Sequence, residues 1–356
     1  MNYRQVLYIS PNPKLKGGIA SVVRQYKTYI GKDFRHFSTI DCSNNLLNVL
    51  SFPIKILYFI IYLFINREIK IVHIHGASRG SFYRKYIIFL ISKHFFDKKV
   101  IYHIHGGEFH LFIDEVTLII RKKINSFIEN TDGLITLSKQ WKLFFSNTFK
   151  CKSIETVNNI VPFCNLEEKK KNESHLIRLL FLGKVSKGKG IFDILQSVKK
   201  NKELFENKIK IIIGGDGEIE VLKRIISEYS ISNIVEYIGW VDGKKKNDLF
   251  LESDIMLLPS YNEGLPISLL EALSYKMPLI STHVGGIPEI LVHKKNGFVV
   301  EPGNIDQITE SLIFYLENKS LIKLHGDNSY QIANRYFPEA VFDQLTKIYK
   351  KLLDEY

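Results

Sequence analysis

The stretch DIMLLPSYNEGLPISLLEALSYKMPLISTHVGGIPEI, residues 254–290, has the pattern of two strands with a helix between them. The apolar runs DIMLLPS (254–260) and PLIST (278–282) have the length of buried strands, and the segment 266–275 has a helical pattern. Two strands joined through a helix lie parallel in one sheet, because the chain must cross back before the second strand begins. This stretch therefore predicts a βαβ unit of an α/β domain.

The same alternation of strand and helix occurs along the whole chain and restarts once, after the charged stretch CNLEEKKKNESH (164–175). We predict two tandem, doubly wound, Rossmann-like α/β domains at 1–165 and 176–335, a linker at 166–175 and a C-terminal helix at 336–356. The expected strands are VLYIS (6–10), HFSTI (36–40), IKIVHIH (69–75), KVIYHIH (99–105) and GLITLS (133–138) in the first domain, and IRLLFLG (177–183), KIKIIIGG (208–215), IVEYIG (234–239), DIMLLPS and PLIST in the second.

The composition is typical of a globular protein with an anionic partner. The chain has 356 residues, more than one hydrophobic core usually serves, and 45% of them are hydrophobic. Its formal net charge of +12 indicates nucleic acid, a membrane surface or phosphorylated small molecules. Nucleic acid is not expected, because the basic residues are dispersed and no reader motif is present. Cys42, Cys151 and Cys164 are too few and too far apart for a disulfide framework, which fits a reducing cytoplasm.

The most apolar stretch, ILYFIIYLFI (56–65), has ten residues, whereas a membrane-spanning helix needs about 20. We expect a buried helix of the first domain, because this run leads directly into the strand at 69–75. The alternative is a surface that lies in a membrane interface, together with SFYRKYIIFLISKHFF (81–96), which contains Arg84, Lys85 and Lys93. The N-terminus lacks the apolar core of a signal peptide, so export by that route is not expected.

The second domain carries a series of motifs near the ends of its strands. They are FLGKVSKGKG (181–190), IIIGGDGE (211–218), VEYIGWV (235–241), the pair Glu263 and Glu271, STHVGGIPEI (281–290) and NGFVVEPG (296–303). In this order they resemble the group 1 glycosyltransferases, the large retaining family 4 with the GT-B fold. The resemblance covers nearly the whole chain. It implies two Rossmann-like domains that face a central cleft, with a C-terminal helix that crosses back to the first domain.

Glu263 and Glu271 lie at the start of the expected helix and inside it. Pro266 suits the first turn of a helix, which leaves backbone N–H groups near Gly264 and Leu265 open to an anion such as a diphosphate. The resemblance implies that Glu263 contacts the donor sugar and that Glu271 binds the nucleotide ribose. Both carboxylates are then expected to accept hydroxyl protons rather than to pair with lysines. The alternative is a helix-start carboxylate and an ordinary surface residue.

GKVSKGKG (183–190) is a basic loop directly after a strand. The resemblance implies that Lys184 and Lys189 bind the donor diphosphate, with Lys184 at a position where the family commonly has arginine. The alternative is an ordinary solvated loop. In the first domain, Gly17 and Gly18 of KLKGGIA (14–20) allow close approach of the backbone to a phosphate or a sugar.

HIHGGEFH (103–110) places two histidines at the end of a strand. His103 and His105 can share one face of that strand, because alternate residues point to opposite faces. With Glu108 nearby they suggest a metal site, but we expect them to contact a sugar or phosphate. The resemblance favours His105, since the family has a histidine near the sugar there. The alternative is a histidine of the core.

The sequence thus predicts a retaining hexosyltransferase with Glu263, His105 and Lys189 as its catalytic residues. It needs no metal and no cofactor besides its donor, a UDP- or GDP-linked sugar. No Asp-x-Asp pair is present to hold a metal, so Lys184, Lys189 and the helix N-terminus are expected to stabilise the leaving diphosphate. No protein nucleophile is assigned.

The expected acceptor is a glycan or a lipid-linked glycan of bacterial capsule, exopolysaccharide or O-antigen assembly. Such an enzyme works in the cytoplasm, with peripheral contact to the anionic inner face of the plasma membrane. Two alternatives share the architecture. One is a nucleotide-sugar 2-epimerase, and the other is a noncatalytic partner subunit that binds a nucleotide sugar.

Overall fold

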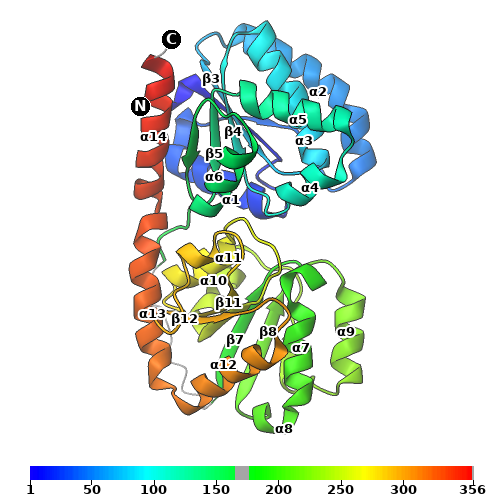
Figure 1. Cartoon of the computed structure of the whole chain (residues 1–356), viewed down its shortest axis with the longest axis vertical. Coiled ribbons are helices and arrows are strands. Elements are labelled where there is room, and N and C mark those ends of the chain that lie inside the picture. The colour runs from blue at the N-terminus through cyan, green and yellow to red at the C-terminus, as the bar shows by residue number, and fades with distance from the viewer. Residues whose placement is uncertain (165–175, 355–356) are drawn as a thin grey trace. The chain divides into compact units, whose positions relative to one another are not determined.

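The computed structural model describes residues 1–164 and 176–354, so the linker expected at 166–175 lies outside the described residues. The chain divides into two compact units, residues 1–160 with 338–356 and residues 161–337 (Figure 1). Within the described residues, each unit contains one parallel six-stranded sheet whose strands are connected by helices. The predicted pair of doubly wound α/β domains is confirmed.

The sheet of the first unit has the strand order β2-β1-β3-β4-β5-β6. Its central strands are buried along their whole length, as their β-branched and aromatic side chains predict. The edge strand β6 was not predicted, because its three residues form no apolar run. The elements are β1 (Val6–Ser10), α1 (Gly18–Ile30), β2 (Arg35–Ser38), α2 (Asn45–Ile65), β3 (Ile71–Gly76), α3 (Gly80–Leu90), β4 (Lys99–Ile104), α4 (Phe109–Glu115), α5 (Leu118–Asn130), β5 (Gly133–Thr136), α6 (Lys139–Thr148), β6 (Ile154–Thr156) and α14 (Pro338–Asp354).

The two faces of this sheet differ in chemistry. One face is apolar, and its core includes Phe82 of α3 and Phe127 of α5. The other face carries polar rings, among them His73, whose Nδ1 lies 2.5 Å from the hydroxyl of Tyr349 on α14. Leu345 and Tyr349 are fully buried on this side. The C-terminal helix therefore completes the first unit, as its predicted return to the first domain requires.

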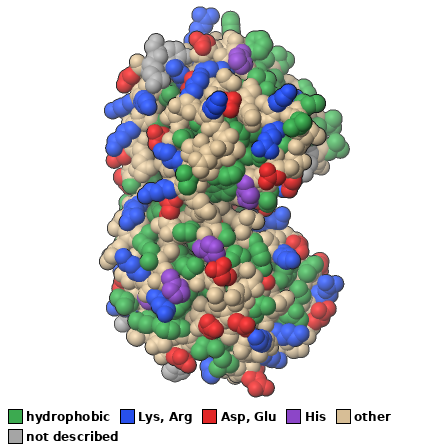
Figure 2. All heavy atoms as spheres, in the orientation of Figure 1, with side chains coloured by type: hydrophobic (Ala, Val, Ile, Leu, Met, Phe, Trp, Pro, Cys, Tyr) green, Lys and Arg blue, Asp and Glu red, His purple; other side chains and the backbone are tan. Residues whose placement is uncertain are grey.

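The helix α2 does not have the burial that the sequence led us to expect. The apolar run 56–65 is the second half of a helix of 21 residues. Only 17% of an 18-residue window within Leu46–Ile65 is buried. Among the described residues, this helix is the one long and apolar enough to span a membrane. The prediction of a buried helix is wrong, because α2 is apolar on all sides whereas only one side can pack on the sheet. Figure 2 shows hydrophobic side chains along the side of the unit on which α2 lies in Figure 1.

A second correction concerns the basic segment 81–96. The alternative of a membrane surface placed Lys85 at the interface, but its side chain is buried and its Nζ donates a hydrogen bond to the Thr39 hydroxyl. Burial lowers the pKa of Lys85 well below its usual value. Its alkyl chain is apolar enough to enter the core, so a basic residue in a helical pattern did not indicate exposure here.

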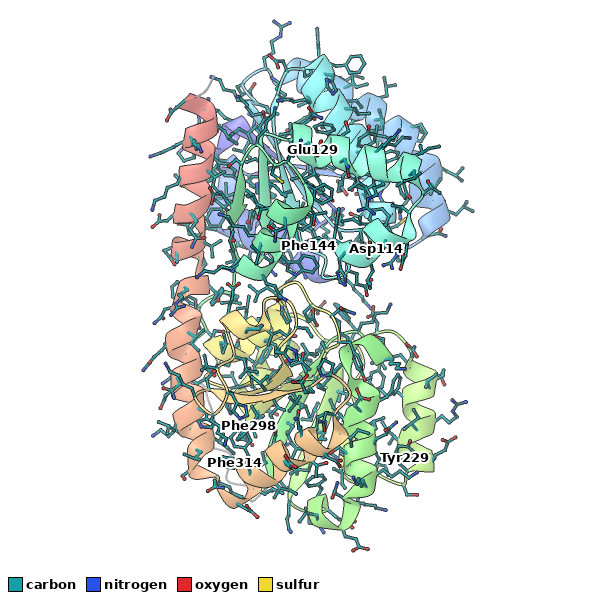
Figure 3. All side chains as sticks on the ribbon, in the orientation of Figure 1. Asp114, Glu129, Phe144, Tyr229, Phe298 and Phe314 are labelled. Atoms are coloured by element: carbon teal, nitrogen blue, oxygen red, sulfur yellow. The ribbon has the colours of Figure 1, made fainter. Side chains whose placement is uncertain are left out.

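The sheet of the second unit has the strand order β12-β11-β10-β7-β8-β9. Phe298 of β12 packs against Phe314 of α12, with 4.8 Å between ring centroids (Figure 3). The edge strand β12 was not predicted, because its residues were assigned only to the motif NGFVVEPG. The elements are β7 (Ile177–Leu182), α7 (Ile191–Lys200), α8 (Lys202–Phe205), β8 (Ile209–Gly214), α9 (Ile219–Glu228), β9 (Val235–Tyr237), α10 (Gly243–Glu252), β10 (Ile255–Leu258), α11 (Ile267–Ser274), β11 (Leu279–Thr282), β12 (Gly297–Val300), α12 (Ile305–Glu317) and α13 (Ser320–Ala333).

The burial of α14 predicts that the last helix stabilises the first unit. Leu345→Ala should lower the free energy of unfolding by about 2–5 kcal/mol, because it removes a fully buried side chain and leaves a cavity. Leu324→Ala on α13 is the control, since that side chain is 54% exposed. Urea unfolding measures the free energy of unfolding of both variants, and hydrogen exchange of β3 separately measures the local stability of the first unit. Equal stability of the two would contradict the packing of α14 on this unit.

Candidate functional site

The carboxyl ends of the strands in the second unit carry loops that hold one another through backbone hydrogen bonds. The loop after β7 bonds to the loop after β8, because Val185 N–H donates to the Asp216 carbonyl at 2.6 Å. It also bonds to the loop after β10, where Tyr261 N–H donates to the Gly188 carbonyl at 2.9 Å. This edge of a parallel sheet is where α/β proteins bind ligands. The loops therefore form a candidate site within the second unit.

Two glycines allow the loops to approach this closely. Gly190 follows the short 3-10 turn Lys187–Lys189 with φ +71°, and a Cβ there would lie 2.1 Å from the Pro259 carbonyl oxygen. Gly285 follows β11 with φ +56°, and a Cβ there would lie 1.9 Å from the Glu263 carbonyl oxygen. A side chain at either position would displace backbone. The two glycines thus fix where the loop after β10 lies.

Lys189 and Glu263 meet at this point. Lys189 Nζ donates to Glu263 Oε1 at 2.5 Å, and the Ser260 hydroxyl donates to the same oxygen at 2.8 Å. Glu263 is only 8% exposed. A carboxylate this buried requires a cation or several donors to offset the loss of water. The structure thus joins the two residues that were expected to act on different parts of a donor.

Glu271 lies in α11 and has a similar environment. Its Oε1 accepts a hydrogen bond from Lys246 Nζ of α10 at 2.5 Å, and the residue is 7% exposed. Both glutamates were expected not to pair with lysines, and the structure contradicts that part of the expectation. Each carboxylate is too buried to remain without a cation, and a lysine occupies the place where hydroxyl groups were expected.

The backbone between the two glutamates presents a helix N-terminus. Gly264, Leu265 and Pro266 are buried. The N–H of Gly286 donates a hydrogen bond to the Gly264 carbonyl at 2.6 Å. Pro266 is the residue before the first turn of α11, whose N–H groups receive no cap from any side chain of the described residues. Lys184 lies in the loop after β7 and is exposed. The cations and open N–H groups make this part of the unit suited to an anion.

The candidate residues of the first unit lie after two different strands. Gly17 and Gly18 are exposed at the start of α1, and Gly17 has φ +127°. His105 follows β4, and β3 lies between β4 and β1 in the sheet. The His105 ring is half-buried, with Nε2 2.8 Å from His75 Nδ1. His75 was not predicted as a site residue, because it lies within the expected strand 69–75.

Four histidines gather on the polar face of this sheet. His103 is fully buried, as the alternative of a core histidine stated, and its Nδ1 lies 3.3 Å from His73 Nε2. Burial lowers the pKa of His73 and of His105 to about 3, and it lowers the pKa of His75 and His103 well below the usual value. All four rings are therefore neutral near pH 7. His105 can exchange hydrogen bonds with a ligand but does not bring a positive charge.

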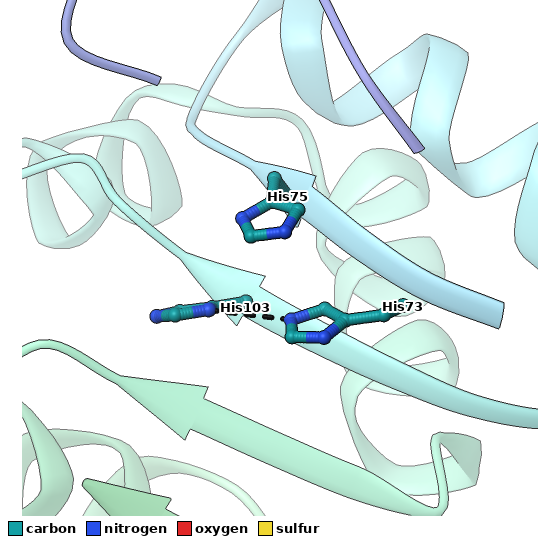
Figure 4. A group of neighbouring side chains, drawn as sticks. All are labelled: His73, His75 and His103. Carbon is teal, nitrogen blue, oxygen red and sulfur yellow. Dashed lines mark hydrogen bonds between the residues drawn. The ribbon is translucent and has the colours of Figure 1, made fainter. Parts of the chain in front are cut away.

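Three of these histidines could reach one metal ion. Ring nitrogens of His73, His75 and His103 lie within 4.8 Å of one another, and neutral imidazoles are transition-metal ligands (Figure 4). His73, however, already uses Nδ1 for the Tyr349 hydroxyl and Nε2 for His103. A metal would have to displace one of these bonds. The rings of His73 and His75 are also stacked, with 6° between their planes, so their nitrogens lie side by side instead of converging.

Two residues at the candidate site of the second unit were missed. Lys246 belongs to the run GKKK (243–246), where nothing in the sequence tells which lysine faces Glu271. Ser260 directly precedes YNEG, and its hydroxyl could have been considered because it stands three residues before Glu263. Both residues contact a glutamate only once the chain is folded, so the sequence does not show these contacts.

Comparisons with known proteins find similarity to one family. The family model described as "Glycosyl transferases group 1" matches residues 165–332. An uncharacterized glycosyltransferase of Methanocaldococcus jannaschii is 27% identical over 78% of this chain and 74% of its own length. An uncharacterized 41.2 kDa protein in the cps region of Klebsiella pneumoniae is 29% identical over 74% of this chain and 75% of its own.

Solved structures share the fold at low sequence identity. Sucrose-phosphate synthase from Thermosynechococcus elongatus has a TM-score of 0.82 at 14% identity and covers 99% of this chain and 100% of its own. Anabaena HepE in complex with UDP-glucose has a TM-score of 0.78 at 14% identity and covers 97% of this chain and 99% of its own. At this identity the likeness concerns the fold.

The close approach at Gly285 predicts a local destabilisation. Gly285→Ala should cost at least about 1–3 kcal/mol, because it combines a left-handed backbone with a clash against the Glu263 carbonyl. Gly239→Ala also puts a side chain on a backbone with positive φ (+79°), but it meets nothing within 4 Å among the described residues, so the comparison reports mainly on the clash. Urea unfolding and hydrogen exchange of residues 260–266 compare the two. The predicted role of Gly285 is wrong if both variants lose the same stability.

Proposed function

We propose that the chain is a group 1 glycosyltransferase, as the match of residues 165–332 to that family supports, and that it moves a hexose with retention from a nucleoside diphosphate sugar to an acceptor hydroxyl. The observation that carries this proposal is the meeting of Lys189, Glu263 and Ser260 beside the open N-terminus of α11. A cation, a carboxylate and free backbone donors within one group of loops match the parts of such a donor. The cation and the N–H groups suit a diphosphate, and the carboxylate suits a sugar hydroxyl.

The diphosphate is the leaving group, and negative charge grows on it as the glycosidic bond breaks. Lys189, Lys184 and the N–H groups of α11 supply positive charge where that happens, which stabilises the transition state. We propose that these groups take the place of a divalent cation. Lys189 then shifts its partner from Glu263 to the diphosphate, and the freed Glu263 oxygen binds a hydroxyl of the sugar.

The second ion pair would act in the same way on the nucleoside. Glu271 is proposed to accept hydrogen bonds from the ribose hydroxyls, and Lys246 holds its carboxylate until the ribose arrives. In the first unit, His105 is proposed to bind a sugar hydroxyl as a neutral ring, oriented by His75. Gly17 and Gly18 are proposed to let the backbone approach a phosphate or sugar.

The relatives indicate the classes of donor and acceptor that are worth testing. Anabaena HepE was solved with UDP-glucose, and a relative in Bacillus anthracis is named N-acetyl-alpha-D-glucosaminyl L-malate synthase. A UDP-hexose is therefore the proposed donor, before a GDP-linked one. The Klebsiella relative lies in a cps region, which supports capsule assembly and a glycan or lipid-linked glycan as acceptor. We place this reaction in the cytoplasm.

Donor binding is predicted to need no metal. UDP-glucose or UDP-N-acetylglucosamine at 100 times its dissociation constant should stabilise the protein by about 2.7 kcal/mol, in EDTA and in Mg²⁺ alike. GDP-mannose is the control nucleotide sugar in the thermal shift measurement. Stabilisation by no nucleotide sugar, or only with a divalent cation, would contradict the proposed site.

The reaction class is tested by the products formed from the donor that binds. Incubation with a glycan acceptor should give a new glycoside with the anomeric configuration of the donor, as seen by NMR. Formation of an epimeric nucleotide sugar without any acceptor would identify the 2-epimerase alternative. Binding without any product on an acceptor panel would favour the noncatalytic subunit.

The role of Lys189 gives the sharpest prediction on the site. Lys189→Ala should lower turnover by roughly 100- to 1000-fold, as the loss of one group that stabilises a developing anion does. Lys187→Ala is the matched control in the same turn, because that lysine is exposed. Turnover and donor dissociation constant are measured separately.

A double variant separates this role from a structural one. Lys189→Ala alone leaves Glu263 buried without its cation, which can destabilise the loop. Glu263→Gln removes that charge, so the double variant should regain stability. We expect it not to regain the turnover of Glu263→Gln alone. Equal turnover of these two variants would show that Lys189 serves only to hold the loop.

A further inference from the structure

The helix α2 presents a continuous apolar surface to solvent. Residues spaced along one side of it are between 46% and 73% exposed: Leu50, Ile54, Leu57, Ile61, Phe64 and Ile65. Single exposed apolar residues are ordinary, but a contiguous row over about four turns indicates a surface that is covered in use. Figure 2 shows hydrophobic side chains gathered on this side of the first unit.

The packing of α2 fixes how the helix is presented. Phe59 and Leu63 are fully buried on its opposite side, and Phe59 lies against Phe37 with 5.0 Å between ring centroids. Both side chains belong to the core of the unit. The helix is therefore held lengthwise on the surface of a folded domain. It has the length to cross a bilayer, but crossing would require removal of Phe59 and Leu63 from this core.

The helix α2 carries no net negative charge of its own, and a cation lies at its C-terminal end. Residues 45–65 contain no aspartate or glutamate and one lysine, Lys55, which pairs with Asp41. At the C-terminal end, the Arg67 guanidinium lies 5.4 Å from the Phe64 ring centroid, so a cation borders the apolar row.

The two units divide the charge of the chain very unequally. The first unit, residues 1–160 and 338–356, has 26 lysines and arginines against 14 aspartates and glutamates, a net charge of +12. Residues 161–337 have 23 of each, a net charge of zero. The whole surplus of positive charge therefore belongs to the unit that carries α2. A surplus of this size attracts an anionic surface and repels a second copy of the same unit.

We propose that α2 docks the first unit on an anionic lipid bilayer, with the helix parallel to the bilayer plane and its apolar row among the acyl chains. An apolar helix face with basic residues around it is the pattern of a helix that binds a membrane interface. The sequence alternative combined the run 56–65 with the segment 81–96, but Lys85 of that segment is buried, so α2 carries the proposed surface. The docking would bring the protein to a lipid-linked acceptor, but it does not depend on the donor site.

Vesicle sedimentation tests the proposal on the full chain. The wild-type protein should bind vesicles of phosphatidylglycerol and phosphatidylcholine at least about ten-fold more tightly than vesicles of phosphatidylcholine alone, and the difference should shrink in high salt. The triple variant Leu50→Gln, Ile54→Gln, Leu57→Gln should lose about ten-fold or more of this binding, because three apolar side chains no longer enter the bilayer. The matched control replaces Leu204, Val292 and Leu324, exposed apolar residues of the second unit, by glutamine and should bind like wild type.

Two further measurements keep the outcome clear. Hydrogen exchange of α2 in the wild-type protein should slow on addition of anionic vesicles, which needs no variant. The thermal shift by UDP-glucose should be equal in all three proteins, so a failed donor site and a failed membrane surface are told apart. Equal vesicle binding by the triple variant and wild type, or no binding by wild type, would overturn the proposal. A lipid-independent dimer that only the triple variant loses would assign α2 to a second copy instead.

Discussion

The burial of Glu263 is the constraint on which the candidate site depends. A carboxylate at the end of β10 can lose its water only if a cation and hydroxyl replace it, and Lys189 and Ser260 do so. Lys189 reaches Glu263 because the turn before Gly190 lies directly on the Pro259 carbonyl, where a side chain would not fit. One ion pair thus requires a glycine of one loop, a serine of another and the backbone between them.

A buried ion pair between a glutamate and a lysine occurs twice in the second unit and not among the candidate residues of the first. Glu271 and Lys246 repeat the buried pair on α11 and α10, so two carboxylates with their own cations flank the start of α11. Such pairs hold polar groups in position without net charge. In the first unit, burial keeps His73 and His105 neutral, so that unit offers hydrogen bonds there.

The sequence predicted the architecture well because strand and helix periods are local. The βαβ unit at 254–290 and the return of the C-terminal helix needed only apolar spacing and a family resemblance. The short edge strands β6 and β12 lacked such spacing. Burial was harder to predict. Lys85 lies inside the core and α2 lies largely outside it, because hydropathy does not tell which side of a helix meets a sheet. The pairing of Glu271 with Lys246 depends on the packing of two helices, which no single segment encodes.

The division of charge changes what the net charge of the chain means. A value of +12 first suggested phosphorylated ligands and membranes alike, yet the unit with the diphosphate candidates Lys184 and Lys189 is neutral as a whole. A small anion needs only a few cations at contact distance, since charges beyond about 10 Å are screened at 0.1 M salt. A bilayer that contains anionic lipids is an extended negative surface, and many basic residues of one domain can contribute to its attraction. We therefore relate the surplus of the first unit to the proposed membrane contact, and the local ion pairs of the second unit to the proposed donor site.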